Sequence, residues 1–408
     1  MIILNSFKKV KCFILIPAIL FFSSIQPIYC DDDMETKPHI PFITSEKVIA
    51  SKKAPTVNAL AAVVIEVSSG RILYSKNAAV RRSIASTTKI MTAIVALENG
   101  NLEDEVQISK RAAGIRGSTL GMRTGQKFTL RELLYAMLMI SANDAAIAVA
   151  EHIGGTVEGF AAMMNKKAES LGAADSHFVT PHGLDTDNQY STAYDVAIIT
   201  KYALKNPVFA EIVCTTNSQI PGYGLYNTNE LLGAYPGVDG VKTGYTGKAG
   251  RCLVSTAQKD GMRIVAVVLG SPTRNARATA SMDLLDYAYE NYCMHKLLGA
   301  GDVYSKVPVI RGVEGYASIK VEQSVELPLS DMEAEALEVR EYVPGSLNAP
   351  VYAGMNTGFI EYVLNGDVVA QSMLTTSEDI RKKTYIDYLE FVLESWGRMM
   401  REGIFAGD

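Results

Sequence analysis

Cysteine, tryptophan and histidine are scarce in this sequence of 408 residues, which contains five cysteines, one tryptophan and five histidines. Cys12 and Cys30 lie within the first thirty residues, and Cys214, Cys252 and Cys293 have no C-x-x-C spacing. This pattern excludes a disulfide framework and a cysteine-ligated zinc site. We therefore interpret the last three cysteines as small, buried apolar side chains.

The sequence also lacks a lysine- or arginine-rich stripe, and its formal net charge is -5. Nucleic acid is therefore not expected as a partner. It contains neither a Gly-x-Ser-x-Gly elbow nor a His-Glu-x-x-His helix, which excludes two common hydrolase designs, and no metal or cofactor is expected. With 48% hydrophobic and 20% charged residues, the composition is that of a globular protein.

The N-terminal segment differs in character from the rest of the chain. Lys8, Lys9 and Lys11 precede an apolar run from Cys12 to Phe22. This arrangement predicts a signal peptide over residues 1–30, and hence an exported protein that works at the extracytoplasmic face of the membrane, in the periplasm or in the cell wall. The run is short for a membrane span, so a retained anchor is the weaker alternative. Residues 31–54, which are polar and contain Pro38 and Pro41, are expected to be a spacer.

Residues 55–298 have the pattern of a large α+β domain. Strands are predicted over residues 59–67, 71–74, 238–243, 251–257 and 263–269, which suggests one antiparallel sheet drawn from both ends of the segment. Helices are predicted between and after them, over residues 87–98, 133–140, 144–153 and 280–292. A cleft is expected where the sheet meets the helical part.

The C-terminal quarter changes pattern twice. Residues 299–376 contain short alternating segments broken by proline and glycine, which predicts a small all-β domain. Residues 377–408 predict one amphipathic helix. Its apolar stripe consists of Ile386, Leu389, Val392, Leu393, Trp396, Met399, Met400 and Ile404. This stripe fits a helix lying on a membrane surface, and it fits equally a helix packed on the β domain.

The first motif with chemical meaning is a serine followed by a lysine three residues later. Ser86 and Lys89 would lie on one face at the start of the first predicted helix, within reach of each other. A lysine kept neutral by burial and nearby cations can accept the serine proton, which makes Ser86 a nucleophile. The spacing alone is not specific, because Ser6 and Lys9 repeat it in the leader.

The second motif, Ser141 and Asn143, lies in a break between two predicted helices. A hydroxyl there can relay a proton to a leaving group, and the amide can hold the substrate or the lysine. The simpler interpretation is that one of these residues caps the following helix.

The third motif, Lys242, Thr243 and Gly244, ends a predicted strand. A cation, a hydroxyl and a bare glycine backbone side by side suit a peptide that lies along the strand and ends in a carboxylate. An ordinary strand end with a turn is the alternative for this segment taken alone.

Together the three motifs have the order and the structural contexts of penicillin-binding proteins and class A β-lactamases. The chain resembles the low-molecular-mass penicillin-binding proteins of the D-alanyl-D-alanine carboxypeptidase family. The resemblance rests on the residues in and around the motifs, in the segments 84–92, 141–146, 181–185, 227–232 and 237–246. It implies the β-lactamase-like α+β fold with a helical subdomain, followed by the β domain and the tail helix.

The resemblance also implies a reaction and its partners. Ser86 would attack the bond between the last two D-alanines of a peptidoglycan pentapeptide, and water would hydrolyse the acyl-enzyme. β-Lactam antibiotics would acylate Ser86 covalently, and the tail helix would hold the enzyme at the membrane. Arg277 matches the family arginine that helps to bind the terminal carboxylate, and the oxyanion would be held by the N–H groups of Ser86 and of a residue after Gly244.

Two departures and three rivals accompany the resemblance. Ile84 stands where many relatives have proline, and Tyr245 stands where some have histidine. A class A β-lactamase is disfavoured because no Glu-x-x-Leu-Asn segment is present and a β domain follows. A D,D-endopeptidase and an inactive wall-binding homologue remain as alternatives to the carboxypeptidase. His152, His177 and His182 are most simply structural, although His182 is a candidate for orienting a loop.

Overall fold

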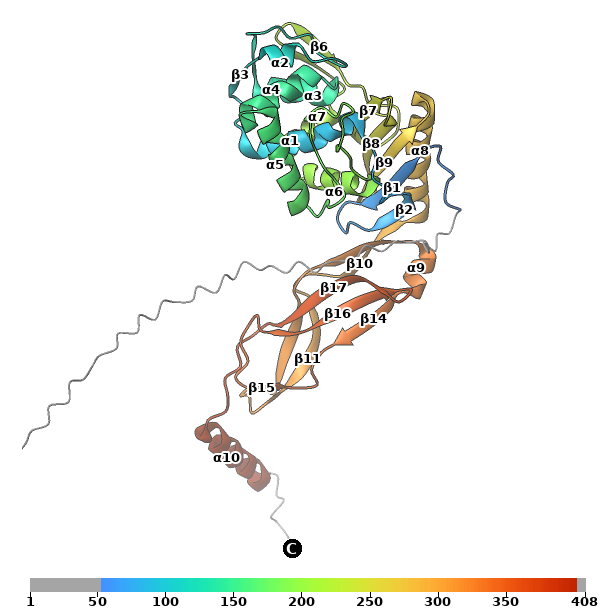
Figure 1. Cartoon of the computed structure of the whole chain (residues 1–408). Coiled ribbons are helices and arrows are strands. Elements are labelled where there is room, and N and C mark those ends of the chain that lie inside the picture. Colours follow the sequence, from blue (N-terminus) through green and yellow to red (C-terminus); the bar gives the residue numbers. More distant parts are fainter. Residues whose placement is uncertain (1–52, 402–408) are drawn as a thin grey trace, which may run out of the picture. The chain divides into compact units, whose positions relative to one another are not determined.

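The computed structural model describes residues 53–401. The predicted signal peptide and almost all of the predicted spacer lie outside the described residues, as do residues 402–408, including Ile404 of the apolar stripe. Within residues 53–401 the structure has the α+β layout expected from the sequence (Figure 1).

A five-stranded antiparallel sheet has the order β2-β1-β9-β8-β7. The strands are β1 (Ala61–Glu66), β2 (Ile72–Lys76), β7 (Val238–Thr246), β8 (Gly250–Lys259) and β9 (Met262–Ser271). The central strand β9 is almost continuously apolar because both of its faces are covered. Val265 and Val267 pack into one hydrophobic core, and Ile264 and Ala266 pack into the other. Strands β1 and β9 pair although their paired residues, from Ala61 with Leu269 to Glu66 with Ile264, are about 200 positions apart in the sequence.

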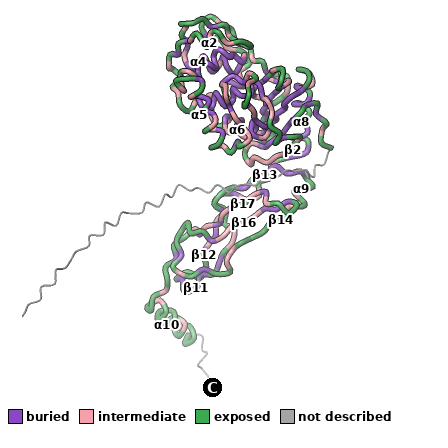
Figure 2. The backbone as a smooth tube through the Cα atoms, in the orientation of Figure 1, coloured by how far each residue is buried: buried purple, intermediate pink, exposed green. Residues whose placement is uncertain are grey.

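Helices cover both faces of this sheet. One face carries α8 (Arg274–Asn291), whose Leu284 and Leu285 are fully buried. The other faces the helical part, which consists of α1 (Lys89–Asn99), α2 (Lys110–Ala113), α3 (Leu130–Met139), α4 (Asn143–Gly154), α5 (Val157–Ser170), α6 (Ala193–Ala203) and α7 (Pro207–Cys214). In Figure 2 this part has a buried interior beneath an exposed outer surface. Two short antiparallel strand pairs, β3 (Glu105–Gln107) with β4 (Lys127–Thr129) and β5 (Asn217–Ile220) with β6 (Tyr223–Tyr226), flank it.

The C-terminal β domain has its own hydrophobic core. Its six-stranded sheet has the order β14-β16-β17-β12-β11-β15, and β10 pairs with β13 beside it. The elements are β10 (Cys293–Leu298), β11 (Val303–Ile310), β12 (Tyr316–Val321), β13 (Val325–Leu329), α9 (Asp331–Ala336), β14 (Glu338–Tyr342), β15 (Leu347–Asn348), β16 (Asn356–Leu364) and β17 (Asp367–Thr376). Alternate residues of the strands, such as Ile319, Ile360 and Leu374, fill the core.

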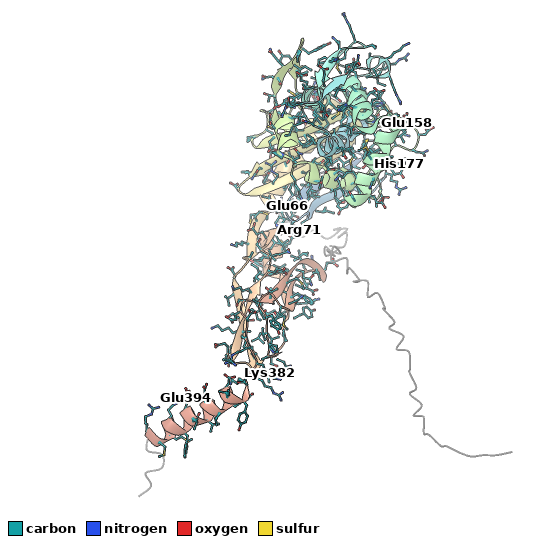
Figure 3. The ribbon with its side chains drawn as sticks, turned by 90° about the vertical axis from the view of Figure 1, so that its left-hand side faces the viewer. Glu66, Arg71, Glu158, His177, Lys382 and Glu394 are labelled. Carbon is teal, nitrogen blue, oxygen red and sulfur yellow. The ribbon has the colours of Figure 1, made fainter. Side chains whose placement is uncertain are left out.

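The tail helix α10 (Tyr385–Arg401) has no buried side chain. Figure 3 shows its side chains standing out from the helix, with Glu394 labelled on the polar face. None of the helices within residues 53–401 combines the length and the apolar character that a membrane crossing requires.

Three local predictions are corrected by the structure. Cys214 and Cys293 are exposed, and only Cys252 is buried. Helix α8 starts at Arg274, six residues before the predicted start, because the Thr273 hydroxyl accepts a hydrogen bond from the Ala276 N–H and caps the helix. Charged residues in this first turn had hidden the apolar periodicity. Ser86 lies in a 3₁₀ turn, Ala85–Thr88, and α1 begins only at Lys89.

Candidate active site

The 3₁₀ turn Ala85–Thr88 presents Ser86 directly before α1. Ala85 has a positive φ of 49°, which is uncommon for a residue with a side chain and is often associated with functional turns. Two hydroxyls fix the turn: Thr87 donates to the carbonyl oxygen of Ile84 at 2.7 Å, and Thr88 donates to that of Ala85 at 2.8 Å. Ser86 itself is half-buried, whereas its neighbours Ala85 and Thr87 are buried. The turn, closed by these two hydrogen bonds, therefore presents the Ser86 hydroxyl at a partly accessible point.

Lys89 is fully buried at the start of α1, and its Nζ atom is 3.1 Å from Ser86 Oγ. The same nitrogen donates to Asn143 Oδ1 at 2.7 Å and to the carbonyl oxygen of His182 at 2.8 Å. Burial, and then the positive charge of Lys242, hold the pKa of Lys89 well below its ordinary value, while Asp144 partly opposes the shift. A neutral amine next to a serine hydroxyl is able to accept its proton.

Ser141 and Asn143 lie where α3 ends and α4 begins. Ser141 adopts a positive φ of 65°, and its buried Oγ has no hydrogen-bond partner among residues 53–401. A buried hydroxyl without a partner is rare unless it serves a function or a ligand. Asn143 is the first residue of α4, and its amide donates to the carbonyl oxygen of Arg116 at 2.8 Å. Neither residue caps the helix with its side chain, because the N-cap is Ala142 and no side-chain cap bond is present.

Strand β7 is one of the two edge strands of the sheet and carries the third motif. Lys242 is buried, and burial together with the charge of Arg277 lowers the pKa of Lys242 to about 7. The hydroxyl oxygens of Thr243 and Thr228 are 2.7 Å apart, which orients the Thr243 side chain. Since an edge strand has backbone groups free on one side, β7 can receive an extended peptide there.

Gly244 lies against the turn that carries Ser86. A β-carbon at Gly244 would lie 3.0 Å from the backbone nitrogen of Ser86 and 3.1 Å from the β-carbon of Ala85. Only glycine allows β7 to pass this close, so the backbone of β7 at Gly244 lies beside the backbone nitrogen of Ser86. An oxyanion requires backbone donors placed close together in this way.

Arg277, in the first turn of α8, is buried and bound to a carboxylate that the sequence analysis did not identify. Its Nε is 3.2 Å from Glu230 Oε1, and its Nη2 is 2.5 and 2.6 Å from the two oxygens of Glu230. Nη1 donates to the carbonyl oxygen of Cys252 at 3.3 Å. Glu230 lies in the segment 227–232, which carries part of the family resemblance. Membership of that segment was the one signal in the sequence that pointed to Glu230 as a residue near the site.

The segment around His182 completes the surroundings of Lys89. The backbone carbonyl of His182 accepts a bond from Lys89, and its Nδ1 accepts one from the N–H of Leu184 at 3.1 Å. Burial, followed by the charges of Lys89 and Arg111, lowers the pKa of His182 to about 3, so its ring is neutral at pH 7. Gly183 has a φ of +83°, and a β-carbon there would lie 2.0 Å from the Ala85 carbonyl oxygen. The segment thus packs tightly against the Ser86 turn and helps to position Lys89.

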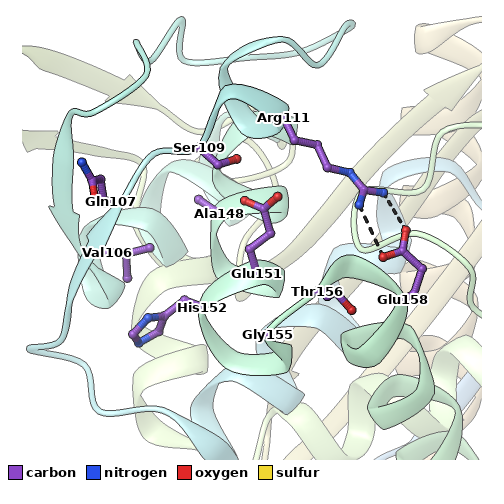
Figure 4. A pocket seen from close by; sticks show the side chains of 10 residues that line it. All are labelled: Val106, Gln107, Ser109, Arg111, Ala148, Glu151, His152, Gly155, Thr156 and Glu158. Carbon is purple, nitrogen blue, oxygen red and sulfur yellow. Dashed lines mark hydrogen bonds and ion pairs between the residues drawn. The ribbon is translucent and has the colours of Figure 1, made fainter.

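A separate hollow lies beside α4 and is lined by residues such as Val106, Ser109, Glu151 and His152 (Figure 4). An ion pair between Arg111 and Glu158 crosses one side of it. None of the residues of the three motifs lines this hollow. It is therefore distinct from the site around Ser86.

The structure thus brings the predicted site residues into one region. Ser86, Lys89 and Asn143 are linked by hydrogen bonds. Lys242 is close enough to Lys89 for its charge to affect the lysine pKa, and Gly244 contacts the Ser86 turn. No group of three or more potential metal-ligating side chains occurs within the described part of the chain.

Comparison with known proteins identifies two family models along the chain. Residues 48–273 match the D-alanyl-D-alanine carboxypeptidase family, and residues 292–382 match the C-terminal domain of penicillin-binding protein 5. The D-alanyl-D-alanine carboxypeptidase DacF of Bacillus subtilis is 35% identical over 351 residues, which cover 83% of this chain and 90% of the relative. DacA of Escherichia coli K12, a protein of the same description, is 30% identical over 388 residues, covering 90% and 92% of the two chains.

Solved structures agree with these matches. Penicillin-binding protein 5 from Haemophilus influenzae is similar with a TM-score of 0.73 and 30% identity, over 81% of this chain and all of that one. A peptidoglycan synthesis regulatory factor, PBP3, from Streptococcus pneumoniae is similar with a TM-score of 0.68, also at 30% identity, over 80% of this chain. The chain therefore belongs to the D-alanyl-D-alanine carboxypeptidase family, and it is a serine-type D-alanyl-D-alanine carboxypeptidase.

Proposed function

We propose that Ser86 is the acylated nucleophile of this carboxypeptidase and that Lys89 is its base. The observation that carries the proposal is the buried Lys89 amine, 3.1 Å from Ser86 Oγ, with a pKa held well below its ordinary value. Ser86 Oγ attacks the carbonyl carbon of the penultimate D-alanine while Lys89 Nζ accepts the hydroxyl proton. The peptide bond then breaks, and the terminal D-alanine leaves with a proton on its nitrogen.

Ser141 is proposed to carry that proton to the leaving nitrogen. Its buried, unpartnered hydroxyl supports this role, because a relay needs one free acceptor and one free donor position. Asn143 is proposed to hold Lys89 in place through its Oδ1 atom. Water then hydrolyses the ester on Ser86, which releases the shortened peptide and restores the hydroxyl.

Lys242, Thr243, Gly244 and Arg277 are proposed to bind the substrate. The close approach of Gly244 to the Ser86 nitrogen supports an oxyanion site made of the N–H groups of Ser86 and Tyr245. The substrate would be the peptidoglycan pentapeptide, and β-lactam antibiotics would form the same ester on Ser86. Export through the predicted signal peptide would bring the enzyme to this substrate outside the cytoplasm.

The test is mass spectrometry of the leader-free protein after incubation with penicillin. We expect one adduct per chain, and peptide mapping should locate it on Ser86. A well-folded protein that forms no adduct would contradict the mechanism and favour the inactive wall-binding homologue. Incubation with pentapeptide and with cross-linked dimer then separates the remaining rival, since a D,D-endopeptidase would cleave the cross-link in preference to releasing D-alanine.

The domain boundaries are proposed as 55–292 for the catalytic domain, 293–376 for the β domain and 377–408 for the tail. Strand β10, which begins at Cys293, pairs with β13 of the β domain and so belongs to that domain. This pairing supports a junction about six residues before residue 298, where the catalytic domain was expected to end. The gap between the two matched family models, 273 to 292, is occupied by α8.

We also propose that α10 lies on the membrane surface and holds the enzyme there. All of its apolar stripe within residues 385–401 is exposed or half-buried, including Leu389 at 48%, Leu393 at 55% and Trp396 at 58% exposure. Contact with a bilayer would remove these side chains from water. The polar face, with Asp387, Glu390, Glu394, Arg398 and Arg401, would remain in water.

Fluorescence tests this proposal cleanly, because Trp396 is the single tryptophan of the chain. Adding phosphatidylethanolamine/phosphatidylglycerol vesicles should shift the emission to shorter wavelength. Leu389→Glu combined with Leu393→Glu should weaken the partitioning at least about tenfold, since each leucine buries apolar surface worth about 1.5–3 kcal/mol. The matched control, Glu390→Gln with Glu394→Gln, should bind at least as well as the native protein. An unchanged spectrum would instead favour a helix packed on protein.

A further inference from the structure

Asp185 ends the segment 181–185, which carries part of the family resemblance, and the mechanism above gives it no role. Its carboxylate joins this segment to the end of strand β7. Oδ1 accepts a hydrogen bond of 2.8 Å from the Thr246 hydroxyl, and Oδ2 accepts one of 3.3 Å from the backbone N–H of Lys248. The Thr246 oxygen in turn accepts the N–H of Ala249 at 3.0 Å, which leaves the hydroxyl proton for the carboxylate.

Both segments that Asp185 joins pack against the turn that carries Ser86. A β-carbon at Gly183 would clash with the carbonyl oxygen of Ala85, and one at Gly244 would lie 3.0 Å from the backbone nitrogen of Ser86. These two close approaches meet different atoms of the same turn. The turn is therefore held by both segments at once, and Asp185 links the two segments directly.

The same two segments carry the groups that the proposed mechanism needs at a fixed separation. On one of them, the His182 carbonyl oxygen accepts a hydrogen bond of 2.8 Å from Lys89 Nζ. On the other, strand β7, the N–H of Tyr245 is the second proposed oxyanion donor and directly precedes Thr246. Because Thr246 and Gly244 are two residues apart on the strand, they face the same side of the sheet, which is the side of the Ser86 turn.

We propose that Asp185 is a positioning residue of the acylation step, which fixes strand β7 in place relative to Lys89. The inference rests on the proposed roles of Ser86 and Lys89. Asp185 does not touch the reacting atoms and acts through Thr246. During acylation the proton moves to Lys89 while negative charge builds up on the substrate oxygen, so the base and the oxyanion donors must be in place together. A misplacement of about 1 Å can cost about a hundredfold in rate.

The experiment measures acylation of the leader-free protein by a fluorescent penicillin in single-turnover reactions. Thr246→Val keeps the branched shape of the side chain and removes the hydroxyl, whereas Thr246→Ser keeps the hydroxyl and removes the methyl group. The rate constant at saturating penicillin should fall about tenfold to hundredfold in Thr246→Val and in Asp185→Ala. In Thr246→Ser it should stay within about threefold of the native value, and half-saturation should shift by less than about threefold in all variants, because ground-state binding is kept.

The matched control is Asp187→Ala, which removes a second carboxylate two residues further along the chain and should leave the acylation rate unchanged. Asp185 and Asp187 are both exposed, so neither change opens the hydrophobic core. Every variant should still reach one adduct per chain, since a misplaced strand slows the reaction of every molecule, whereas unfolding lowers the fraction that reacts. Asp185→Ala combined with Thr246→Val should lose little more than the larger single loss, because both changes remove the same contact.

Four results would overturn the proposal. They are a native rate in Thr246→Val or in Asp185→Ala, a Thr246→Ser variant as slow as Thr246→Val, an equal loss in Asp187→Ala, and losses that multiply in the double variant. The second would assign the effect to packing of the methyl group, the third to net charge, and the fourth to two unrelated contacts. A failure of the proposed mechanism is recognised separately, because the native protein would then form no adduct on Ser86.

Discussion

Replacing Ser86 with alanine is expected to abolish the penicillin adduct and to lower D-alanine release from pentapeptide by at least about 10⁴-fold. The physical reason is that the Ser86 hydroxyl supplies the atom to which the acyl group becomes attached, and Lys89 alone cannot form a stable ester. Intact mass after penicillin treatment measures the first effect, and product release measures the second. The fold should survive, because the change removes one half-buried hydroxyl and surface substitutions of this kind cost less than about 1 kcal/mol.

The matched control for this variant is Ser170→Ala. Ser170 is an exposed residue at the end of α5, and its hydroxyl donates to the carbonyl oxygen of Lys167 in the same helix. This control should form the adduct at the native rate. Retention of a stoichiometric adduct by Ser86→Ala would show that another residue is acylated.

Replacing Lys89 with methionine or with arginine is expected to lower the acylation rate by about 10²- to 10⁴-fold in both cases. Methionine keeps the approximate length and removes the base. Arginine keeps a positive charge but stays protonated, and so cannot accept the Ser86 proton. The comparison therefore separates a base from a simple cation: an arginine variant with native activity would contradict the proposed role of Lys89.

The fold of the methionine variant needs its own measurement. The pKa of Lys89 is lowered in the folded protein, whereas in the unfolded chain it has the usual lysine value of about 10.4. At any pH between these two pKa values the unfolded chain binds more protons than the folded one, so the free energy of unfolding rises with pH across this range. Below the folded-state pKa, the folded protein bears the full cost of a charged, buried amine. The methionine variant lacks this cost but leaves the Asn143 oxygen and the His182 carbonyl without their donor, which costs about 1–3 kcal/mol each. Urea unfolding as a function of pH should therefore show a smaller slope for the variant than for the native protein.

Local sequence patterns were most informative where hydrophobic periodicity and short motifs coincide. Strand β9 reads as an apolar run because both faces are buried, and its prediction agrees with the observed strand within two residues at either end. The predominance of strands in the C-terminal domain followed from the alternation in segments such as β12, whereas the short helix α9 was not predicted. The helix α8 was predicted too short, because Arg274 and Arg277 make its first turn polar and the Thr273 cap was not used.

Predictions about burial failed where they rested on residue type alone. Cysteine is often buried, yet Cys214 ends α7 and Cys293 begins β10, and both are exposed. Residue type gives only an average tendency, whereas exposure depends on which element packs over the side chain.

The residue types and the spacing of the candidate site were determined by the sequence. Ser86 and Lys89 are three residues apart, and Lys242 to Gly244 are consecutive, so their spacing follows from local geometry and is legible in the chain. The family matches agree with the activity inferred from these motifs.

Only the tertiary structure decided which of these groups act on one another. Lys89 and Asn143 are 54 residues apart in the chain, yet they share a hydrogen bond of 2.7 Å. Arg277 and Glu230 are 47 residues apart, and their pairing occupies the Nε and Nη2 donors of Arg277. Such contacts depend on how the helical part and the two ends of the sheet pack together, which local patterns do not encode. The lowered pKa of Lys89 has the same origin, because burial and the charge of Lys242 exist only in the folded chain.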